Sequence, residues 1–245
     1  MNLPDALDAA TGLTCVVGAG GKKTTLYALA GRLDRAVVTA TVRIPIFDEE
    51  VAAVVVTDDP IGSAAAADRF PLGLVPERER EDRYRGYDPE TVADLAAAHD
   101  GPVLVKADGA RTRWLKAPNE REPRIPAAAD TVIPLASARI VGKPLTDERI
   151  HRPERVAAVT GRKVGEEVRT EDVGAVLASE EAGLKGVPEG ATAIPVVNMV
   201  DDSQLEAVGR EIAEGVLARA PDSVPRVVLT RMVADDPVVA VVERS

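Results

Sequence analysis

Short apolar runs and one helical stripe alternate along the first quarter of the chain. Residues 13–17 form an apolar, β-branched run that ends in the glycine-rich segment 18–21, a typical break between a strand and a loop. Over residues 22–33 the apolar positions recur at helical spacing. Two further apolar runs, at 36–41 and 53–56, indicate strands. The pattern therefore predicts a strand, a loop, a helix and two more strands.

The rest of the chain continues this alternation. Asp88-Pro89 predicts a helix start, because proline is well tolerated at the first helical position. Ser203 and Glu206 have the spacing of a capping box. Further apolar runs predict strands at 102–107, 131–133, 193–197, 227–230 and 238–242, and apolar stripes predict helices at 153–160, 171–178 and 203–218.

Strands that alternate with helices, several of them Val-rich throughout, indicate an α/β fold. We expect a mostly parallel sheet with helices on both faces. Residues 1–245 are predicted to form a single domain, with a small helical subdomain inserted around 144–190, where the strand pattern fades. The mixed-charge stretch 77–83 is interpreted as a solvated surface segment rather than a site.

The segment between the first strand and the first helix carries candidate chemistry. Its glycines let backbone amides curl around an anion that a helix N-terminus already favours. Lys22 could reach β- and γ-phosphates, and a hydroxyl from Thr24 or Thr25 could bind Mg²⁺. The segment fits the pattern Gly-x-x-Gly-Lys-x-Thr, although Val16 stands where the general phosphate loop has glycine. The full segment reads Gly18-Ala19-Gly20-Gly21-Lys22-Lys23-Thr24-Thr25.

Two other interpretations of this segment explain less. A dinucleotide fingerprint needs glycine where Lys23 stands, and a carboxylate at the end of the second strand, where Thr39 and Thr41 stand. A turn that binds nothing explains the glycines but not the two lysines and two threonines beside them. We therefore interpret the segment as the phosphate loop of a P-loop NTPase-like fold that binds a nucleoside triphosphate, ATP or GTP, with Mg²⁺.

Two features lie downstream of the next predicted strand. Asp108 ends that strand, and P-loop NTPases place an acidic residue there to hold Mg²⁺ or its water. An ordinary Asp-Gly turn is the alternative interpretation. The only tryptophan, Trp114, lies among cations, of which Arg111, Arg113 and Lys116 could face phosphate or an anionic second substrate. The alternative is a charged surface loop that Trp114 anchors to the core.

The remaining polar candidates give weaker signals. Asn198 and Asp201 echo the N-K-x-D element that reads guanine, with Met199 in place of lysine, and a helix entry explains them equally well. His99 and His151 lie outside hydrolase and zinc motifs and are interpreted as structural. Cys15 is interpreted as a small core residue.

Composition narrows the classes of function. Forty acidic and thirty basic residues give a formal charge of −10, and only 2% of residues are aromatic, which excludes a basic, base-stacking nucleic-acid binder. One cysteine allows neither an intramolecular disulfide nor a Cys-based zinc site. No apolar run reaches membrane-spanning length. We expect a soluble cytoplasmic protein with no membrane or nucleic-acid partner, whose acidity is typical of a high-salt cytoplasm or of a GC-rich genome.

Taken together, these residues resemble the YqeC family over most of the chain, from about residue 11 to 230. The resemblance implies a P-loop-type nucleotide-binding fold and a role in maturing a selenium-dependent molybdenum hydroxylase, so that this enzyme or its cofactor would be the client. The most specific part is the D-G…K-A-P…E-P string. The matching segments are 17–22, 107–110, 116–118, 122–123, 125–126, 142–145, 151–154, 183–186 and Asn198.

The chain departs from the family pattern near the site. Lys23 stands where a threonine usually follows the loop lysine, Thr39-Ala40-Thr41 replaces a run of threonines, and Lys106 replaces a glutamate. Two functions stay open. One is a Mg²⁺-nucleotide-dependent accessory protein with NTPase or nucleotidyl- or phosphoryl-transfer activity, and the other is a non-catalytic, nucleotide-gated binding or delivery protein.

The candidate residues follow from these two functions. Lys22 and Asp108 are the catalytic candidates, and Thr24 and Asp108 are the metal-binding candidates. The candidates for binding the nucleotide or a second substrate are Gly18, Ala19, Gly20, Gly21, Lys22, Lys23, Thr24, Thr25, Thr41, Arg111, Lys116, Asn198 and Asp201.

Overall fold

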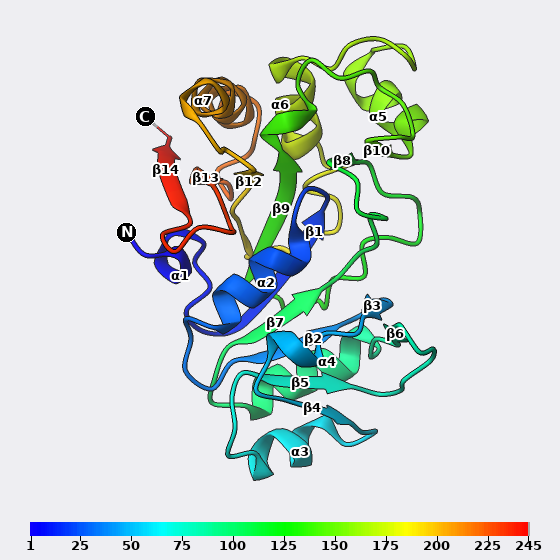
Figure 1. The fold of residues 1–245 in the computed structure, drawn as a ribbon, viewed down its shortest axis with the longest axis vertical. Coiled ribbons are helices and arrows are strands. Elements are labelled where there is room, and N and C mark those ends of the chain that lie inside the picture. Colours follow the sequence, from blue (N-terminus) through cyan, green and yellow to red (C-terminus); the bar gives the residue numbers. More distant parts are fainter. Residues whose placement is uncertain (245) are drawn as a thin grey trace.

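A computed structural model describes residues 1–244 and shows a ten-stranded sheet that runs through the molecule (Figure 1). Its strands are β1 (Leu13–Gly18), β2 (Val37–Ala40), β4 (Ala53–Val56), β5 (Leu72–Val75), β7 (Val103–Lys106), β9 (Thr131–Ser137), β11 (Thr192–Ala193), β12 (Val196–Asn198), β13 (Arg226–Thr230) and β14 (Val238–Glu243). They lie in the order β14-β13-β12-β9-β1-β7-β2-β5-β4, and β11 pairs with β9. Every pairing is parallel except that of β13 with β14. The expected α/β class with a mostly parallel sheet is confirmed.

Helices and short elements complete the fold. The helices are α1 (Leu3–Ala6), α2 (Lys22–Ala30), α3 (Pro60–Ala66), α4 (Pro89–Ala98), α5 (Pro153–Thr160), α6 (Thr170–Ala178) and α7 (Ser203–Leu217), with 3₁₀ turns η1 (Asp48–Glu50) and η2 (Ala138–Ile140). Two small pairs lie outside the main sheet: β3 (Ile44–Pro45) with β6 (Arg83–Tyr84), and β8 (Leu115–Lys116) with β10 (Ile150–His151).

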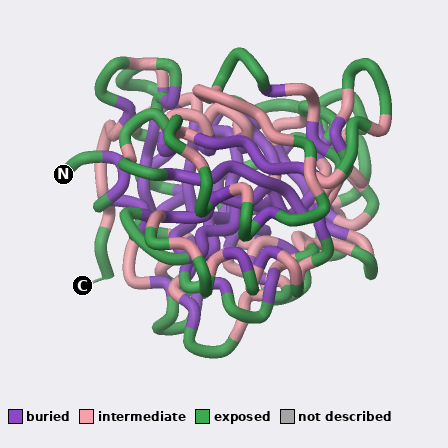
Figure 2. The backbone as a smooth tube through the Cα atoms, turned by 90° about the horizontal axis from the view of Figure 1, so that it is seen from below, coloured by how far each residue is buried: buried purple, intermediate pink, exposed green. Residues whose placement is uncertain are grey.

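The period of two along each strand sends alternate side chains into cores on opposite faces of the sheet. Val16 and Val38 pack with α1 and α2 on one face, whereas Cys15, Val17 and Val37 pack with α3 and α4 on the other. Helices α6 and α7 cover that second face at the β9–β12–β13 end. Figure 2 shows the buried segments running through the middle of the molecule and the exposed ones around it. Helices therefore cover both faces, as predicted.

Several elements confirm the sequence pattern, and two predictions are wrong. Helix α5 has the predicted bounds, and Pro89 is the first residue of α4. The predicted strand 193–197 is split into β11 and β12, because Ile194-Pro195 interrupts it. The capping box is also wrong, since Asp202 caps α7 and its side chain accepts from the Leu205 amide at 2.8 Å. The short side chain of Asp202, one residue before Ser203, thus accepts a hydrogen bond from a free amide in the first turn of α7.

The segment around 144–190 contains α5, α6 and β10. Helix α6 packs against α7, and both share one apolar core with β9, β12 and β13. The division of the chain into a domain and an inserted subdomain stays a prediction. No helix among residues 1–244 combines the length and the apolarity needed to cross a bilayer.

The order of the strands fixes where a ligand site belongs. β1 lies between β7 and β9; the chain leaves β1 through α2 toward β2 on one side, and later enters β9 on the other. In open α/β sheets, ligands bind at the carboxyl ends of the strands where the order reverses in this way. A ligand site is therefore expected at the end of β1, together with the ends of β7 and β9.

Candidate functional site

The loop between β1 and α2 is built from glycines because it lies tightly against neighbouring elements. Gly18, Gly20 and Gly21 have φ values of 86°, 95° and 128°, a region that other residues rarely adopt. A Cβ on Gly20 would stand 2.7 Å from the Ser137 nitrogen at the end of β9, and one on Gly21 would stand 2.3 Å from Asn198 Nδ2. These glycines let the chain pass close to its own β9 and β12.

The backbone amides of this turn fall into two groups. The amides of Gly18, Ala19 and Gly20 donate to Asp108 Oδ2, the Leu135 carbonyl and the Arg113 carbonyl, each at 2.9 Å. The amides of residues 21–24 donate to no group within residues 1–244, and no side chain caps α2. The free donors therefore lie at the N-terminus of α2, where the helix dipole favours an anion. The earlier part of the loop is occupied by the protein's own oxygens.

Lys22 does not extend away from the loop. Its Nζ lies 2.9 Å from Asp108 Oδ1 and also donates to the Gly18 carbonyl. The contact with Oδ1 is an ion pair without hydrogen-bond geometry, so this oxygen has no hydrogen bond within residues 1–244. Burial lowers the pKa of Lys22, and Asp108 partly offsets this effect. The predicted phosphate-binding lysine and the predicted metal-binding aspartate are thus each other's partners.

Asp108 is almost fully buried and lies between two ammonium groups. Lys116 Nζ stands 2.8 Å from Asp108 Oδ2, opposite the Lys22 contact. Burial alone would raise the pKa of Asp108, but Lys22 and Lys116 outweigh it and hold this pKa below its usual value. The carboxylate is therefore charged, and both of its oxygens face cations.

The ion pairs continue beyond Asp108. Lys116 Nζ also lies 2.8 Å from Glu122 Oε2, which in turn lies 3.0 Å from Arg152 Nη1. Glu122 Oε1 accepts from the Gly109 amide at 3.1 Å. We call Lys22, Asp108, Lys116, Glu122 and Arg152 the ion network. It contains the charged residues of the D-G…K-A-P…E-P string, which gives that string a structural explanation.

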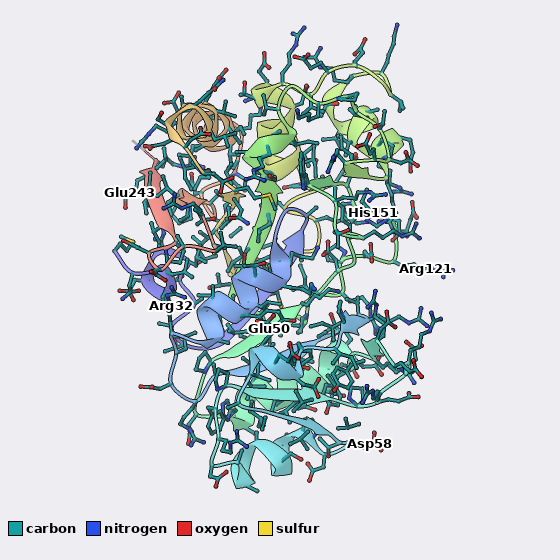
Figure 3. All side chains as sticks on the ribbon, viewed as in Figure 1. Arg32, Glu50, Asp58, Arg121, His151 and Glu243 are labelled. Carbon is teal, nitrogen blue, oxygen red and sulfur yellow. The ribbon has the colours of Figure 1, made fainter. Side chains whose placement is uncertain are left out.

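His151 lies beside the ion network, on β10. Burial, followed by the charge of Arg152, lowers the pKa of His151 to about 4. This histidine is therefore neutral near neutral pH, consistent with a structural role. His151 and Arg121, labelled in Figure 3, mark the side of the molecule on which the loops after β7 and β8 lie.

A cleft of about 390 Å³ opens at the N-terminus of α2. It is lined by the glycine-rich loop between β1 and α2, the segment 109–114, and residues near β3, β6 and β7. Seven basic side chains and no acidic residue of the described chain line it, in a protein of net charge −10. We call it the basic cleft; its basic residues are Lys22, Lys23, Arg43, Arg83, Lys106, Arg111 and Arg113.

The basic residues of the cleft differ in their partners. Three of them form ion pairs, with Asp108 for Lys22 at 2.9 Å, Glu79 for Arg43 at 2.5 Å and Asp82 for Arg83 at 2.8 Å. The other four make no ion pair within residues 1–244: Lys23, Lys106, Arg111 and Arg113. These four are free to bind an anion.

Lys106 is the most buried of the four. It is 6% exposed, and its Nζ donates to the Arg43 carbonyl at 2.7 Å. Burial, and then the charge of Lys22, lowers the pKa of Lys106 to about 7. A buried ammonium without a carboxylate partner is costly, and an anion in the cleft would compensate it.

The hydroxyl candidates lie in different environments. Thr24 lines the basic cleft. Thr25 is buried and its Oγ1 donates to the Gly21 carbonyl at 3.1 Å, one turn back along α2. Thr41 is buried as well, and its Oγ1 donates to the Arg124 carbonyl at 2.6 Å. Only Thr24 of these three is positioned to meet a ligand in the cleft.

Asn198 and Asp201 are occupied by contacts within the protein. Asn198 Nδ2 donates to the Gly20 carbonyl at 2.8 Å, and its Oδ1 accepts from Thr230 Oγ1 at 3.1 Å and from the Met232 amide at 3.2 Å. Asp201 lies 2.6 Å from Arg139 Nη2. Neither residue lines the basic cleft, and neither does Lys116, whose side chain is fully enclosed in the ion network. Their roles as ligands stay predictions.

Several lining residues were not recognised as site candidates from the sequence. Arg83 belongs to the stretch 77–83, which was interpreted as surface; it reaches the cleft because β6 pairs with β3. Arg43 follows the carboxyl end of β2, and Lys106 ends β7, so strand-end position could have found both. Met199 has a φ of 61°, and Arg111 and Thr112 have 48° and 60°. Three strained residues thus border one cleft, as is typical of binding sites.

The two predicted Mg²⁺ ligands, Thr24 and Asp108, lie in different surroundings, and Mg²⁺ binding stays a prediction. Mg²⁺ prefers carboxylate and water oxygens in octahedral geometry. Asp108 offers its oxygens to two lysines, and no group of three His, Cys, Asp or Glu side chains within residues 1–244 could hold a metal ion. Thr24 is the only predicted metal-binding residue that lines the cleft.

Comparisons with known proteins agree with the sequence resemblance. The family model described as YqeC protein matches residues 14–154. The uncharacterized protein YqeC of Escherichia coli strain K12 is 29% identical over 190 residues, which cover 75% of this chain and 74% of that protein. No solved structure matches the chain.

Proposed function

The chain belongs to the YqeC family, and from this premise we propose that its basic cleft binds the phosphates of a nucleoside triphosphate. The observation that carries the proposal is that two groups of available hydrogen-bond donors lie at the same cleft. These are the amides of residues 21–24 and the unpaired cations Lys23, Lys106, Arg111 and Arg113.

Electrostatics favours a polyanion in this place. Lys23, Arg111 and Arg113 are unpaired cations, Lys106 has a pKa of about 7, and no acidic residue of the described chain lines the cleft, so it favours an anion in a protein of net charge −10. Charge-assisted hydrogen bonds to phosphate oxygens are about twice as strong as neutral ones. The free amides of α2 add donors that need no rearrangement. A triphosphate carries negative charge opposite to that of the basic side chains. It also has several oxygen atoms that can accept hydrogen bonds from the free amides and the basic side chains.

The ion network favours the non-catalytic form of this proposal. Asp108 is held by Lys22 and Lys116, so no carboxylate at the cleft is free to position a metal or a water. We infer a nucleotide-gated binding or delivery protein that serves the maturation of a selenium-dependent molybdenum hydroxylase, with that enzyme or its cofactor as client. Family membership is the support for the client. Turnover by Lys22 and Asp108 is the alternative, and it requires their ion pair to open.

A binding titration tests the cleft. Isothermal titration calorimetry with ATP, GTP and inorganic tripolyphosphate should show binding to the unmodified protein. Lys23→Ala and Arg113→Ala should each weaken binding by about tenfold, the worth of one charge-assisted contact. Lys163→Ala is the matched control, because Lys163 is exposed and does not line the basic cleft. Equal affinity in all four proteins, or no binding at all, would remove the proposal.

A turnover assay separates the two forms of the function. The same protein, with Mg²⁺ and saturating nucleotide, should release neither phosphate nor pyrophosphate beyond one equivalent. Steady release that Asp108→Asn abolishes would favour the catalytic form instead. The client is tested in cells that carry Lys23→Ala and Arg113→Ala together, where the activity of the molybdenum hydroxylase should fall.

A further inference from the structure

Trp114 stands in the wall between two cavities. It lines the basic cleft and also a second, larger cavity of about 820 Å³ that lies between η2, the start of α6 and the start of α7. The indole is partly exposed. It is the only tryptophan of the chain. A ligand whose phosphates occupy the basic cleft would therefore meet this ring on its way into the second cavity.

The backbone around Trp114 fixes the position of the ring. Its amide donates to the Arg149 carbonyl at 2.8 Å, and its carbonyl accepts from the Ser137 amide at 2.9 Å. The preceding carbonyl, that of Arg113, accepts from the Gly20 amide. Trp114 is thus one residue away from a direct contact with the phosphate loop, and its distance from the N-terminus of α2 is set by the fold.

One face of the indole already has a cation. The guanidinium carbon of Arg149 lies 4.4 Å from the ring centroid, which is the arrangement of a cation–π contact. Arg149 therefore covers one face of the ring. Every nucleobase has a flat face that can stack on an aromatic ring. A partly exposed indole is therefore a suitable surface for stacking a planar heterocycle.

The second cavity differs in chemistry from the basic cleft. Its apolar lining residues include Val141, Val168, Leu205 and Val208. Charges of both signs stand around them, among them Arg169 and Glu171. Such a lining suits a flat apolar ring with polar edges better than it suits further phosphate groups.

We propose that the second cavity binds the planar heterocycle of the same ligand whose phosphates lie in the basic cleft, with the ring stacked on Trp114. This inference rests on the proposed function. It names Trp114 as the residue that distinguishes a nucleotide from a bare polyphosphate. The alternative is a purely structural role, in which Trp114 only anchors its loop to the core of α6 and α7, against which it packs.

Fluorescence of the single tryptophan tests the inference directly. ATP, GTP and CTP should change the emission of Trp114, whereas inorganic tripolyphosphate should bind with a much smaller change. Each nucleotide should bind about tenfold or more tightly than tripolyphosphate, which is the usual scale of one base–aromatic stack. Calorimetry provides the affinities independently of the fluorescence.

Two variants separate stacking from anchoring. Trp114→Leu keeps an apolar side chain but loses the ring, so nucleotide affinity should fall about tenfold and tripolyphosphate affinity should stay unchanged. Trp114→Phe should retain most of the nucleotide preference. Urea unfolding of both variants shows whether the fold survives. If Trp114→Leu does not fold, the nucleotide preference of Trp114→Phe and the fluorescence of the unmodified protein still distinguish stacking from anchoring.

The outcomes distinguish the two proposals. If neither tripolyphosphate nor any nucleotide binds, the proposed function fails and takes this inference with it. If tripolyphosphate binds but nucleotides bind no more tightly, or if Trp114→Leu retains the full nucleotide preference, the stacking role alone is overturned. A preference for nucleotides that disappears in Trp114→Leu supports it.

Discussion

Two groups of basic residues lie at the same edge of the sheet and differ in one respect, which is whether a carboxylate faces them. In the ion network, Lys22, Lys116 and Arg152 each lie within 3.0 Å of a carboxylate oxygen of Asp108 or Glu122. In the basic cleft, Lys23, Lys106, Arg111 and Arg113 make no ion pair within the described chain.

This difference separates structure from binding. Paired and buried charges add little to stability relative to an apolar core, but breaking a pair leaves an uncompensated charge and is costly. The ion network therefore links the start of α2, the end of β7, β8 with the loop that follows it, and the end of β10. Of the four unpaired cations only Lys106 is buried and carries a desolvation cost. Lys23, Arg111 and Arg113 are partly or fully exposed and can pair with a ligand. Both groups contribute to the sequence resemblance to a nucleotide site. Only the basic cleft has cations that make no ion pair within the described chain.

The largest expected effect comes from breaking the ion network. Asp108→Asn keeps the shape of the side chain but leaves Lys22 and Lys116 facing a neutral group, so the free energy of unfolding should fall by about 3–5 kcal/mol. Denaturation in urea, monitored by circular dichroism, measures this loss.

Asp201→Asn is the matched control for this substitution. Asp201 pairs with Arg139, whose side chain is about half exposed, so the loss should stay within about 1 kcal/mol. Equal losses in the two variants would mean that the ion network contributes no more than a surface pair, and the comparison between the two groups of cations would collapse.

A smaller effect is expected at Asn198. Asn198→Ala removes three hydrogen bonds and leaves the Gly20 carbonyl and the Met232 amide without a partner, which should cost about 2–3 kcal/mol of unfolding free energy. The ratio of ATP to GTP affinity should not change, because the amide of Asn198 is used within the protein. Calorimetry of the variant with both nucleotides measures this ratio.

Asn198→Asp sharpens this test, since it keeps an acceptor but loses the donor to the Gly20 carbonyl. A change in base preference in either variant would contradict the structural assignment and restore Asn198 as a base-reading residue. Loss of stability with an unchanged ratio of ATP to GTP affinity would mean that Asn198, like the ion network, holds the glycine-rich loop in place.

The fold could be predicted from the sequence wherever a local pattern was strong. The β-branched run before the glycines gave β1, and Pro89 gave the start of α4. β5 was missed because Gly73 interrupts its apolar run; this glycine makes room for the Phe47 ring. β11 and β12 were merged because the effect of Pro195 on a strand depends on its neighbours.

The site was predictable only as far as its residues are neighbours in sequence. The glycine-rich loop after β1 and Asp108 could be singled out as candidates because each follows a strand and carries its own sequence signal. The partner of Lys22 was not, since 86 residues separate it from Asp108, and charge compensation between distant residues is a property of the fold. For the same reason Arg83 was interpreted as surface, although β6 brings it to the cleft.

The most gradual effect concerns the pH dependence of stability that Lys106 contributes. Its pKa is about 7 in the folded protein and about 10.4 in an unfolded chain. Between these values the unfolded chain binds more protons, so the free energy of unfolding should rise with pH, by up to about 1 kcal/mol per pH unit. Below pH 7 the penalty for burying the ammonium is fully present.

Lys106→Met removes this contribution. The variant should therefore be more stable than the unmodified protein at pH 6.5, and the difference should shrink by pH 9.5; urea denaturation across this range measures it. Lys163→Met, at an exposed position, should show no such trend. Saturating tripolyphosphate should reduce the penalty at low pH, because an anion beside Lys106 compensates the charge that the fold leaves unpaired. If the two lysine variants follow the unmodified protein in parallel, Lys106 does not carry an uncompensated charge, and the basic cleft loses its most buried cation.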